Sequence, residues 1–393
     1  SKLGALSLIG KQFPVFLLVM ENGEKIELSL PRSDSKTGPG HRGFEVVFNP
    51  YMGKKEAALR RDFTVNAMLE DPLSLELFDF YGGISDLKNK VLRHVSTAFS
   101  EDPLRVLRAG RFVAKTGFSI ADETISFCKE INLNELPVER VENEFRGMLC
   151  EGRYPGDGLL ALEACGALKF FSELEELRNV PQDPKWHPEG DVLTHTALSL
   201  NAAVLRKEEM QDVWVEMLGV LCHDLGKPLT TVLDKGRWRS PKHDVLGVGV
   251  TKLLLEKINT KKDVVPKVCD LVREHLRVVQ LYTDRDKVSD AAIRRLSTRV
   301  DLQSLCRVAF ADFAGRGESV GLPWPPEQWL LARASSLGVK EHPPIRFLRG
   351  QDLVDAGVPP GPEMGKLLAE SYRLQISGEI LTRDDALKWL LNR

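Results

Sequence analysis

The first thirty residues alternate apolar and polar positions, which is the pattern of half-buried β-strands. Apolar residues occupy every second position in two runs, Phe13–Val19 and Ile26–Leu30. Asn22-Gly23 lies between the runs, and Asn-Gly in that place is a strong hairpin signal. The sequence therefore predicts an antiparallel hairpin. The next segment, Ser33–Gly43, is rich in Ser and Gly and has no period, so we expect a mobile loop.

After this loop, the apolar residues recur with the spacing of helices. A helix is expected over Lys55–Leu69, an extended piece over Glu76–Phe80, and helices almost exclusively beyond Leu87. Two proline-containing segments, Asn179–Glu189 and His342–Pro344, are expected to be linkers. A small α/β unit followed by helices argues against a doubly wound sheet, which alternates strand and helix throughout. The predicted fold class is α+β.

Composition narrows the class of protein. Hydrophobic residues make up 42% of the 393 and charged residues 28%, which is typical of a soluble globular chain. The longest apolar stretch near the start, Val15–Met20, is too short for a bilayer, where about 20 residues are needed. The six cysteines form no C-x-x-C pair, which favours a reducing cytoplasm. The net charge of −2 restricts any RNA site to a local patch.

One candidate patch is the run Arg60-Arg61-Asp62-Phe63-Thr64-Val65-Asn66-Ala67. We expect it on a helix, where Asp62 and Asn66 share a face. Paired arginines suit phosphate oxygens, and a carboxylate with an amide could bind a ribose hydroxyl. For this run taken alone, a solvated charged face is the simpler interpretation.

A second patch follows Asp102-Pro103. Arg105, Arg108 and Arg111 recur every third residue on a predicted helix, 103–115, and residues 86–118 hold seven basic and three acidic side chains. Asp102 before a proline is also a good helix N-cap, but capping does not explain three arginines in register. A local basic stripe in an acidic chain indicates phosphate binding.

Asp102 with Arg105 could also read a base. A carboxylate accepts a hydrogen bond from the exocyclic amino group of C or A, and a guanidinium donates to the adjacent ring nitrogen. U and G present a carbonyl oxygen where the carboxylate needs a donor. This pair could therefore select CTP and ATP without a nucleic-acid template.

The blocks Ile9–Phe13, Arg60–Ala67 and Glu101–Arg105, in this order and spacing, resemble the class II tRNA nucleotidyltransferase (CCA-adding) and bacterial poly(A) polymerase family. The resemblance implies a polymerase-β-like head (1–86), a helical neck (87–178), a helical body (179–335) and a tRNA-binding tail (336–393). It implies that Arg61, Arg108 and Arg111 hold the triphosphate and that Asp62 contacts the ribose. It also implies that Arg140, Glu142 and Glu144 brace the neck, and that the loop after Arg32 helps the switch from C to A addition.

In that family, an Asp-x-Asp pair holds Mg²⁺ for the chemistry of the head. No such pair is present at the corresponding place, and Glu27 is the only replacement carboxylate that we single out. Either an N-terminal segment is missing, or the protein is an inactive descendant. The persistence of the base-reading and phosphate residues favours the first. By itself, the 393-residue chain is not expected to polymerise.

Histidines concentrate in the body. His195, the pair His223-Asp224 and the distant Asp312 follow the ligand order of the HD metal-dependent phosphohydrolases, which this region resembles; His243 and His275 complete the predicted metal-binding set. Imidazole and carboxylate ligands suit Ni²⁺, Mn²⁺ or Mg²⁺ acting on a phosphate ester. The resemblance implies a phosphohydrolase or 2′,3′-cyclic phosphodiesterase activity. A lone buried histidine is more often structural, but four around a His-Asp pair indicate a metal site.

In the tail, a Gly/Pro turn runs into a helix at Gly361, and Gly365 and Lys366 follow. Backbone N–H groups at such a helix start can bind phosphate, although an ordinary helix–turn–helix has the same spacing. The resemblance places tRNA binding here.

The predicted function is CCA addition to tRNA from CTP and ATP, with Mg²⁺ in the head and another divalent metal in the HD domain. Neither DNA nor a membrane is expected as a partner. Three alternatives remain open: an ATP-only A-adding enzyme or poly(A) polymerase, an HD phosphohydrolase whose head binds RNA, and an inactive RNA-binding module.

Overall fold

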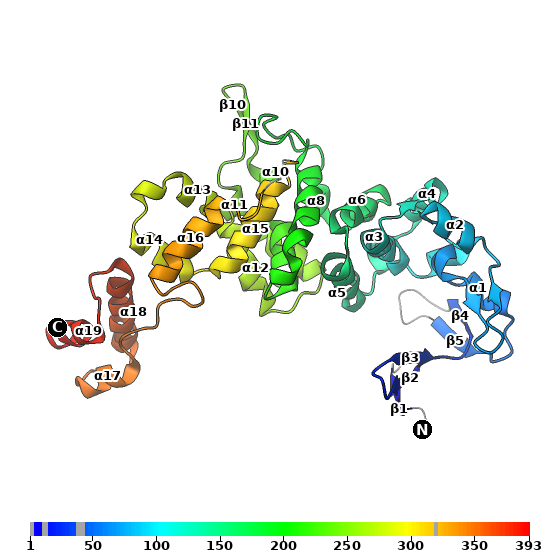
Figure 1. Cartoon of the computed structure of the whole chain (residues 1–393), viewed down its shortest axis with the longest axis horizontal. Coiled ribbons are helices and arrows are strands. Elements are labelled where there is room, and N and C mark those ends of the chain that lie inside the picture. Colours follow the sequence, from blue (N-terminus) through cyan, green and yellow to red (C-terminus); the bar gives the residue numbers. More distant parts are fainter. Residues whose placement is uncertain (1–3, 10–14, 37–43, 318–320) are drawn as a thin grey trace. The chain divides into compact units, whose positions relative to one another are not determined.

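The computed structural model describes residues 4–9, 15–36, 44–317 and 321–393 (Figure 1). The chain forms two compact units. The first comprises residues 1–106 and 118–137, and the second comprises residues 107–117 and 138–393. In the described ranges, no helix is both long and apolar enough to span a membrane.

The first unit contains short strands and helices, in line with the predicted α/β start. Its antiparallel strands are β1 (Gly4–Ile9), β2 (Val15–Met20), β3 (Lys25–Leu28), β4 (Arg32–Lys36), β5 (Phe44–Phe48), β6 (Leu69–Glu70) and β7 (Leu77–Phe78). A parallel pair joins β8 (Val91–Leu92) and β9 (Ser119–Ile120). Its helices are α1 (Lys54–Leu59), α2 (Gly83–Asn89) and α4 (Asp122–Glu130), with 3-10 turns at Thr64–Asn66, Thr97–Glu101 and Leu133–Glu135.

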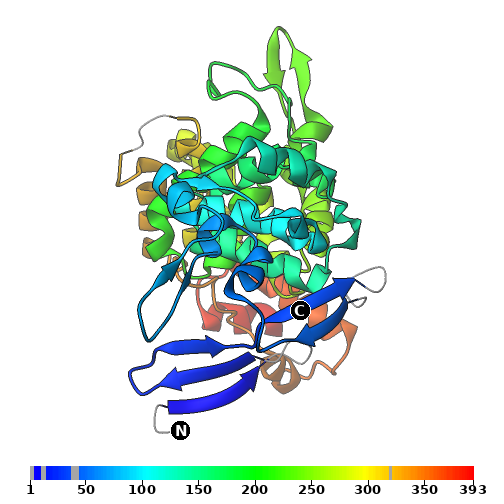
Figure 2. The same ribbon diagram turned by 90° about the vertical axis from the view of Figure 1, so that its right-hand side faces the viewer.

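The predicted hairpin is confirmed by β2 and β3, which pair with Leu18 opposite Ile26 (Figure 2, dark blue). Gly23 has φ +84° in the connecting turn, a conformation that an L side chain rarely adopts. The Glu24 N–H donates to the Asn22 side chain at 2.9 Å. Leu18 is buried, whereas Phe16, two residues away on the same face of the strand, is half exposed.

Two local predictions in this unit are wrong. The loop expected over Ser33–Gly43 begins instead inside strand β4 (Arg32–Lys36), whose backbone pairs with Phe44–Phe48; residues 37–43 lie outside the described ranges. The helix expected over Lys55–Leu69 ends at Leu59. Phe63 instead bridges to His94 and is fully buried against Phe99. This long-range pairing overrides the local helical period, because a buried aromatic side chain contributes more than helix propensity.

The second unit is helical, with a single β-ribbon among its described residues. Helix α3 (Leu104–Thr116) begins in the first unit. The others are α5 (Val138–Arg146), α6 (Pro155–Ala164), α7 (Ser172–Glu175), α8 (Val192–Ala203), α9 (Val213–Cys222), α10 (Lys227–Thr230), α11 (His243–Lys257), α12 (Val264–Glu274), α13 (Arg277–Thr283), α14 (Asp290–Ser297), α15 (Leu302–Ala314), α16 (Pro325–Ser336), α17 (Gly350–Asp355), α18 (Pro362–Ser377) and α19 (Arg383–Leu391). A π-helical turn, Gly147–Glu151, follows α5, and 3-10 turns occupy Ala167–Lys169, Val204–Glu209 and Arg285–Lys287.

The ribbon, β10 (Val232–Asp234) with β11 (Arg237–Arg239), projects from this unit between α10 and α11 (Figure 1). The sequence analysis did not predict it. Lys235 and Gly236 both have positive φ, 50° and 75°, which matches the two-residue turn that hairpins favour.

The core of the second unit lies where α8, α9, α12 and α15 pack together. Leu218, Leu271 and Val308 are fully buried there. Gly219 on α9 allows close approach, since an added Cβ would lie 3.0 Å from Leu271 Cδ1. All members of the histidine cluster described below except His243, which begins α11, lie on these four helices or directly after them, so core packing fixes most of its geometry.

A buried ion pair joins two of these helices. Glu216 on α9 is fully buried and accepts hydrogen bonds from Arg307 Nε at 2.6 Å and Arg307 Nη2 at 2.8 Å, on α15. The Ser304 hydroxyl adds a third bond at 3.0 Å. The pair therefore sets the position of α9 relative to α15.

Replacing Glu216 by leucine should lower the free energy of unfolding by about 3–5 kcal/mol, because the Arg307 cation would be left buried without a partner. Denaturant unfolding followed by circular dichroism measures this. The double variant Glu216→Leu/Arg307→Met should recover most of the loss. Glu363→Gln, which removes the exposed Glu363–Lys366 pair, should cost under about 1 kcal/mol. Equal losses in the two single variants would contradict this account.

The tail residues form a small core of their own around Leu353, Leu374 and Leu390. Residues 342–344, expected to be a linker, contain no helix or strand. The Tyr372 hydroxyl of α18 donates to the Pro344 carbonyl at 2.9 Å, so this segment is held against the tail.

Candidate nucleotide and metal sites

Helix α3 presents its arginines as the sequence predicts. Leu104, Leu107 and Val113 are buried, whereas Arg105, Arg108 and Arg111 are only partly buried. The repeat of three places the arginines side by side along the helix.

Arg105 is held by the backbone of its own unit. Its Nη1 donates to the Ala98 carbonyl at 2.5 Å and its Nη2 to the Arg60 carbonyl at 2.6 Å. Burial lowers the pKa of Arg105, and the nearby Asp102 carboxylate opposes that shift. Asp102 accepts from the Leu104 N–H at 3.1 Å, and its carbonyl accepts from the Arg105 N–H at 3.0 Å. The expected capping interaction and the proximity of Asp102 to Arg105 are therefore both present.

In the run Arg60–Asn66, the side chains of Asp62 and Asn66 contact each other, although the run does not form the predicted helix. Asn66 Nδ2 donates to Asp62 Oδ1 at 3.2 Å, and the Phe63 N–H donates to the same oxygen at 2.9 Å. Arg60 Nη2 pairs with Glu101 at 3.0 Å, while Arg61 is exposed. The carboxylate and the amide thus lie together, as predicted, but a turn brings them there.

Arg108 and Arg111 converge on one buried acid of α5. Glu144 Oε1 lies 3.9 Å from Arg108 Nη1, and Glu144 Oε2 lies 3.5 Å from Arg111 Nη1. Burial raises the pKa of Glu144, and the two guanidinium charges oppose that rise. Nearby, Glu142 accepts from Arg146 at 2.8 Å, whereas Arg140 is exposed. The buried carboxylate orients both arginines.

The other residues predicted to bind a ligand, Glu27 in the head and three residues of the tail, lie at the surface. Glu27 is exposed on β3, opposite Leu17. Gly361 precedes α18, and Gly365 and Lys366 lie in its first turns, where Lys366 pairs with Glu363 at 3.3 Å.

The six predicted metal ligands come together in the second unit, and all are buried. His195 lies on α8 and Asp312 on α15. The other four lie at helix ends: His223 and Asp224 directly after α9, His243 at the start of α11, and His275 directly after α12. The Nδ1 atoms of His223, His243 and His275 each lie 2.7 Å from a backbone carbonyl, which directs their Nε2 atoms inward.

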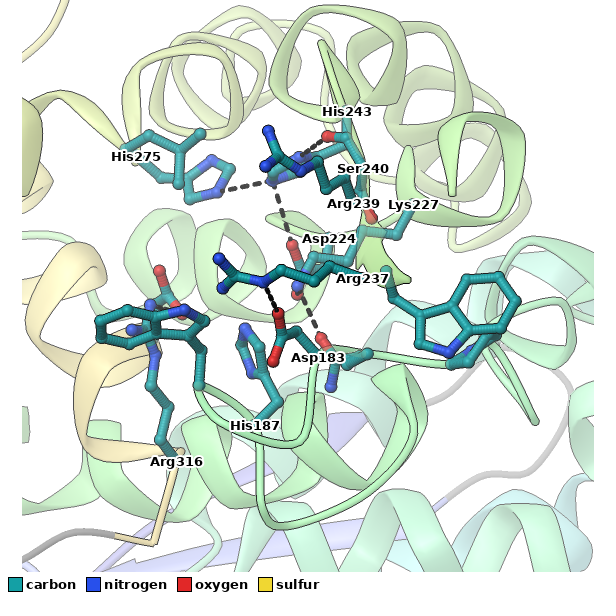
Figure 3. A pocket seen from close by; sticks show the side chains of 16 residues that line it. Asp183, His187, Asp224, Lys227, Arg237, Arg239, Ser240, His243, His275 and Arg316 are labelled. Atoms are coloured by element: carbon teal, nitrogen blue, oxygen red, sulfur yellow. Dashed lines mark hydrogen bonds and ion pairs between the residues drawn. The ribbon is translucent and has the colours of Figure 1, made fainter. Parts of the chain in front are cut away.

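The six ligands form two triads that meet at Asp224, a member of the second triad that also contacts the first. One contains His195, His223 and Asp312, and the other contains Asp224, His243 and His275. Asp224 Oδ2 lies 3.2 Å from His223 Nε2, whereas Asp224 Oδ1 lies 3.3 Å from His243 Nε2. Asp224 therefore faces both triads, one with each carboxylate oxygen. Figure 3 shows its contact with His243 of the second triad.

Two of the six ligands, Asp224 and His275, have pKa values shifted toward the form that binds a cation. Burial alone would raise the pKa of Asp224, but the charges of His223 and Lys227 outweigh it and hold this pKa well below its usual value. The Lys227 Nζ lies 2.6 Å from Asp224 Oδ2. Burial lowers the pKa of His275 to about 4, so its ring is neutral near pH 7, as a metal ligand must be.

The sequence analysis missed a supporting carboxylate. Glu189 Oε1 lies 2.7 Å from His195 Nδ1 and 2.9 Å from His187 Nδ1. Burial would raise the pKa of Glu189, but these two contacts lower it to about 2. A carboxylate bonded to a ligating histidine fixes the ring orientation. The spacing of Glu189, six residues before His195 and one before Gly190, gave no signal on its own.

The segment 179–189 is therefore more than the predicted linker. It forms one wall of a cavity of about 530 Å³ whose floor includes Asp224, His243, His275 and Asp312. Lys227, Arg239 and Arg316 also line this cavity (Figure 3). A cationic cavity over clustered His and Asp ligands can bind a phosphate ester.

Known proteins resemble both the N-terminal head and the chain as a whole. Residues 5–93 match the family described as the Poly A polymerase head domain. The chain is 37% identical to the multifunctional CCA protein of Xanthomonas campestris over 381 residues, covering 92% of this chain and 87% of that protein. It is 38% identical to the multifunctional CCA protein of Vibrio vulnificus over 347 residues, covering 84% and 82%.

Solved structures share the fold. The Bacillus stearothermophilus CCA-adding enzyme in complex with CTP has a TM-score of 0.63 at 20% identity, covering 98% of this chain and 84% of that one. A CCA-adding enzyme with ATP has a TM-score of 0.58 at 18% identity, covering 99% and 80%. These likenesses confirm the predicted α+β class, a polymerase-β-like head followed by helices.

Proposed function

The chain belongs to the family of bacterial multifunctional CCA proteins, and we propose on that premise how its residues divide the work between two activities. It is a tRNA nucleotidyltransferase that adds CCA to tRNA from CTP and ATP. Identity of 37% over nearly the whole chain is the observation that carries this assignment. Incorporation of labelled CTP and ATP into tRNA tests it, and that experiment closes the Discussion.

In the head and neck, we assign base selection to Asp102 with Arg105. The backbone bonds from Arg105 to Ala98 and Arg60 prevent its guanidinium from rotating, so the two side chains offer a fixed acceptor and donor to the edge of C or A. Asp62 with Asn66 would hold the ribose. Arg61, Arg108 and Arg111 would bind the triphosphate, with Glu144 orienting the last two.

The Mg²⁺ ion of the head is not assigned to residues of this chain. In the described part of the first unit, no three His, Cys, Asp or Glu side chains converge, and Glu27 belongs to no such group. The boundaries 1–86, 87–178, 179–335 and 336–393 remain our division by function. Within the last, Gly361, Gly365 and Lys366 remain the proposed contacts to tRNA.

In the body, we propose a phosphohydrolase centre that takes two divalent metal ions, such as Ni²⁺, Mn²⁺ or Mg²⁺. The donor set fits, because each triad offers imidazole nitrogens and one carboxylate, and Asp224 presents one oxygen to each. When bound, the metals supply Lewis-acid activation of a phosphate ester.

The chain's own residues bind and orient that ester. Lys227 and Arg316 place cations at the cavity beside Asp224 and Asp312, where they attract the phosphate oxygens. Glu189 holds the His195 ring in the position that ligation needs. The preferred substrates are phosphate monoesters and 2′,3′-cyclic phosphates.

Metal removal tests this centre. Protein stripped with a chelator should lose hydrolysis of 2′,3′-cyclic AMP and regain it with Ni²⁺ or Mn²⁺. Elemental analysis of the reloaded protein should give two metal ions per chain, and His243→Ala should reduce this to one. A reloaded wild type with a single ion would rule out the two-metal arrangement, and a wild type that hydrolyses no phosphate ester would rule out the activity.

A further inference from the structure

The cavity over the metal ligands has a wall that phosphate binding alone does not explain. Trp186 lines it and is 51% exposed, although large aromatic side chains are usually buried. It lies directly before His187, in the segment 179–189. Lys185 Nζ stands 5.1 Å from the centre of the Trp186 ring.

This wall is fixed in place. The N–H groups of Trp186 and His187 both donate to the Asp183 carbonyl, at 3.0 and 2.9 Å. The Asp183 carboxylate in turn pairs with Arg237 of β11 at 2.7 Å (Figure 3). The tryptophan is thus presented on a turn that is tied to the β10–β11 ribbon, and its exposure is not that of a frayed loop.

The neighbouring β10–β11 ribbon is basic. Residues 232–242, which form the ribbon and its flanks, hold four basic side chains (Lys235, Arg237, Arg239 and Lys242) and one acidic side chain, Asp234. Arg237 and Arg239 lie on one face of β11. Trp238, opposite Leu233 in the register, lies on the other face of the strand, and it also lines the cavity. Arg239 lines the cavity and its side chain is 57% exposed.

We propose that this cavity binds the unpaired 3′-terminal nucleotide of an RNA, with its base stacked on Trp186 and its backbone along the ribbon. An exposed indole beside a basic strip is the combination that binds single-stranded nucleic acid, because every base has a stacking face and every linkage a negative charge. The inference rests on the proposed phosphohydrolase, since it places the terminal phosphate at the metal ligands.

Stacking rather than base-edge hydrogen bonding has a consequence for specificity. The site should accept all four bases with similar efficiency, because a tryptophan face does not distinguish their edges. It should discriminate strongly against phosphate esters that lack a base. Trp186 is therefore a specificity residue, and it has no role in the chemical step.

The test compares two cyclic esters on metal-loaded protein, 2′,3′-cyclic AMP and the base-free cyclic phosphate of glycerol. Trp186→Ala should lower kcat/KM for the nucleotide about tenfold or more, through KM, and should change the value for the glycerol ester less than about twofold. Trp186→Phe should retain most of the activity because phenylalanine keeps a stacking face. An equal loss for both esters would overturn the proposal, as would no loss for either.

A second arm concerns the RNA backbone. An RNA oligonucleotide ending in a 2′,3′-cyclic phosphate should have a lower KM than the mononucleotide, and Lys235→Ser/Arg239→Ser should remove that advantage. Leu233→Ala, on the same ribbon but outside the cavity lining, is the matched control and should preserve it. Equal KM values for the two substrates in the wild type would assign the cavity to free nucleotides and overturn the RNA part. A wild type that cleaves neither ester would instead refute the underlying phosphohydrolase.

Discussion

Asp224→Asn should abolish phosphate-ester hydrolysis while nucleotide addition to tRNA continues at the wild-type rate. Asp224 is the carboxylate that faces both ligand triads, with Oδ2 toward His223 and Oδ1 toward His243. An asparagine keeps the size but loses the negative charge that a divalent ion needs. It also leaves the Lys227 ammonium, 2.6 Å away, without its counter-charge.

The expected magnitude is large. Changes to residues that merely support a metal ligand cost about 10–100-fold in affinity, so loss of a shared ligand should weaken metal binding by more than about 100-fold. Metal content after dialysis and hydrolysis of 2′,3′-cyclic AMP measure the two effects. Asp270→Asn, on the helix that precedes His275, is the matched control and should keep both metals. A folded Asp224→Asn protein that retains two metals and full hydrolysis would contradict the assignment.

Asp102→Asn should relax the choice of nucleotide rather than only slow the reaction. The asparagine amide can donate to the carbonyl oxygen of U, where the carboxylate can only accept, so this contact no longer rejects U. The N3–H of U still opposes the Arg105 donor, so the relaxation is partial. A good bidentate pair contributes about 1–3 kcal/mol of discrimination. A loss of that discrimination corresponds to a fall of roughly 5- to 150-fold in the preference for CTP over UTP.

Single-turnover incorporation of CTP and UTP into tRNA measures this ratio. Asp102→Ala, which can neither accept nor donate, should lower incorporation of CTP and ATP together, and because it offers UTP no new hydrogen bond, UTP should gain less than in Asp102→Asn. Asp122→Asn, an exposed carboxylate at the start of α4 in the same unit, should leave the ratio unchanged. Unaltered selectivity in Asp102→Asn would remove this residue from base reading, whatever happened to the rate.

Periodicity and residue type predicted the parts of the fold that are determined locally. The three-residue repeat of Arg105, Arg108 and Arg111 predicted the basic face of α3, and Asn22-Gly23 predicted the β2–β3 hairpin. The order of His195, His223-Asp224 and Asp312 predicted a cluster that the helix packing assembles.

What the sequence did not reveal depends on distant contacts. Nothing local distinguishes Phe63 in a helix from Phe63 bridged to His94. Segment 179–189 has the Pro and Asp content of a linker, but Glu189 contacts His195 and Asp183 pairs with Arg237. The division of six ligands into two triads depends on side-chain directions set at three helix ends, where four of the ligands lie; spacing along the chain does not encode these directions.

The most direct test of the central assignment is stepwise nucleotide incorporation by the protein expressed from its whole gene. The substrate is tRNA that ends before the CCA sequence, with CTP and ATP supplied separately and then together. CCA addition predicts two CTP additions with CTP alone, no ATP addition with ATP alone, and a single final ATP with both. Incorporation of ATP only, and only on tRNA that already ends in CC, would contradict CCA addition and identify an A-adding enzyme; tRNA binding with no incorporation would identify an RNA-binding module.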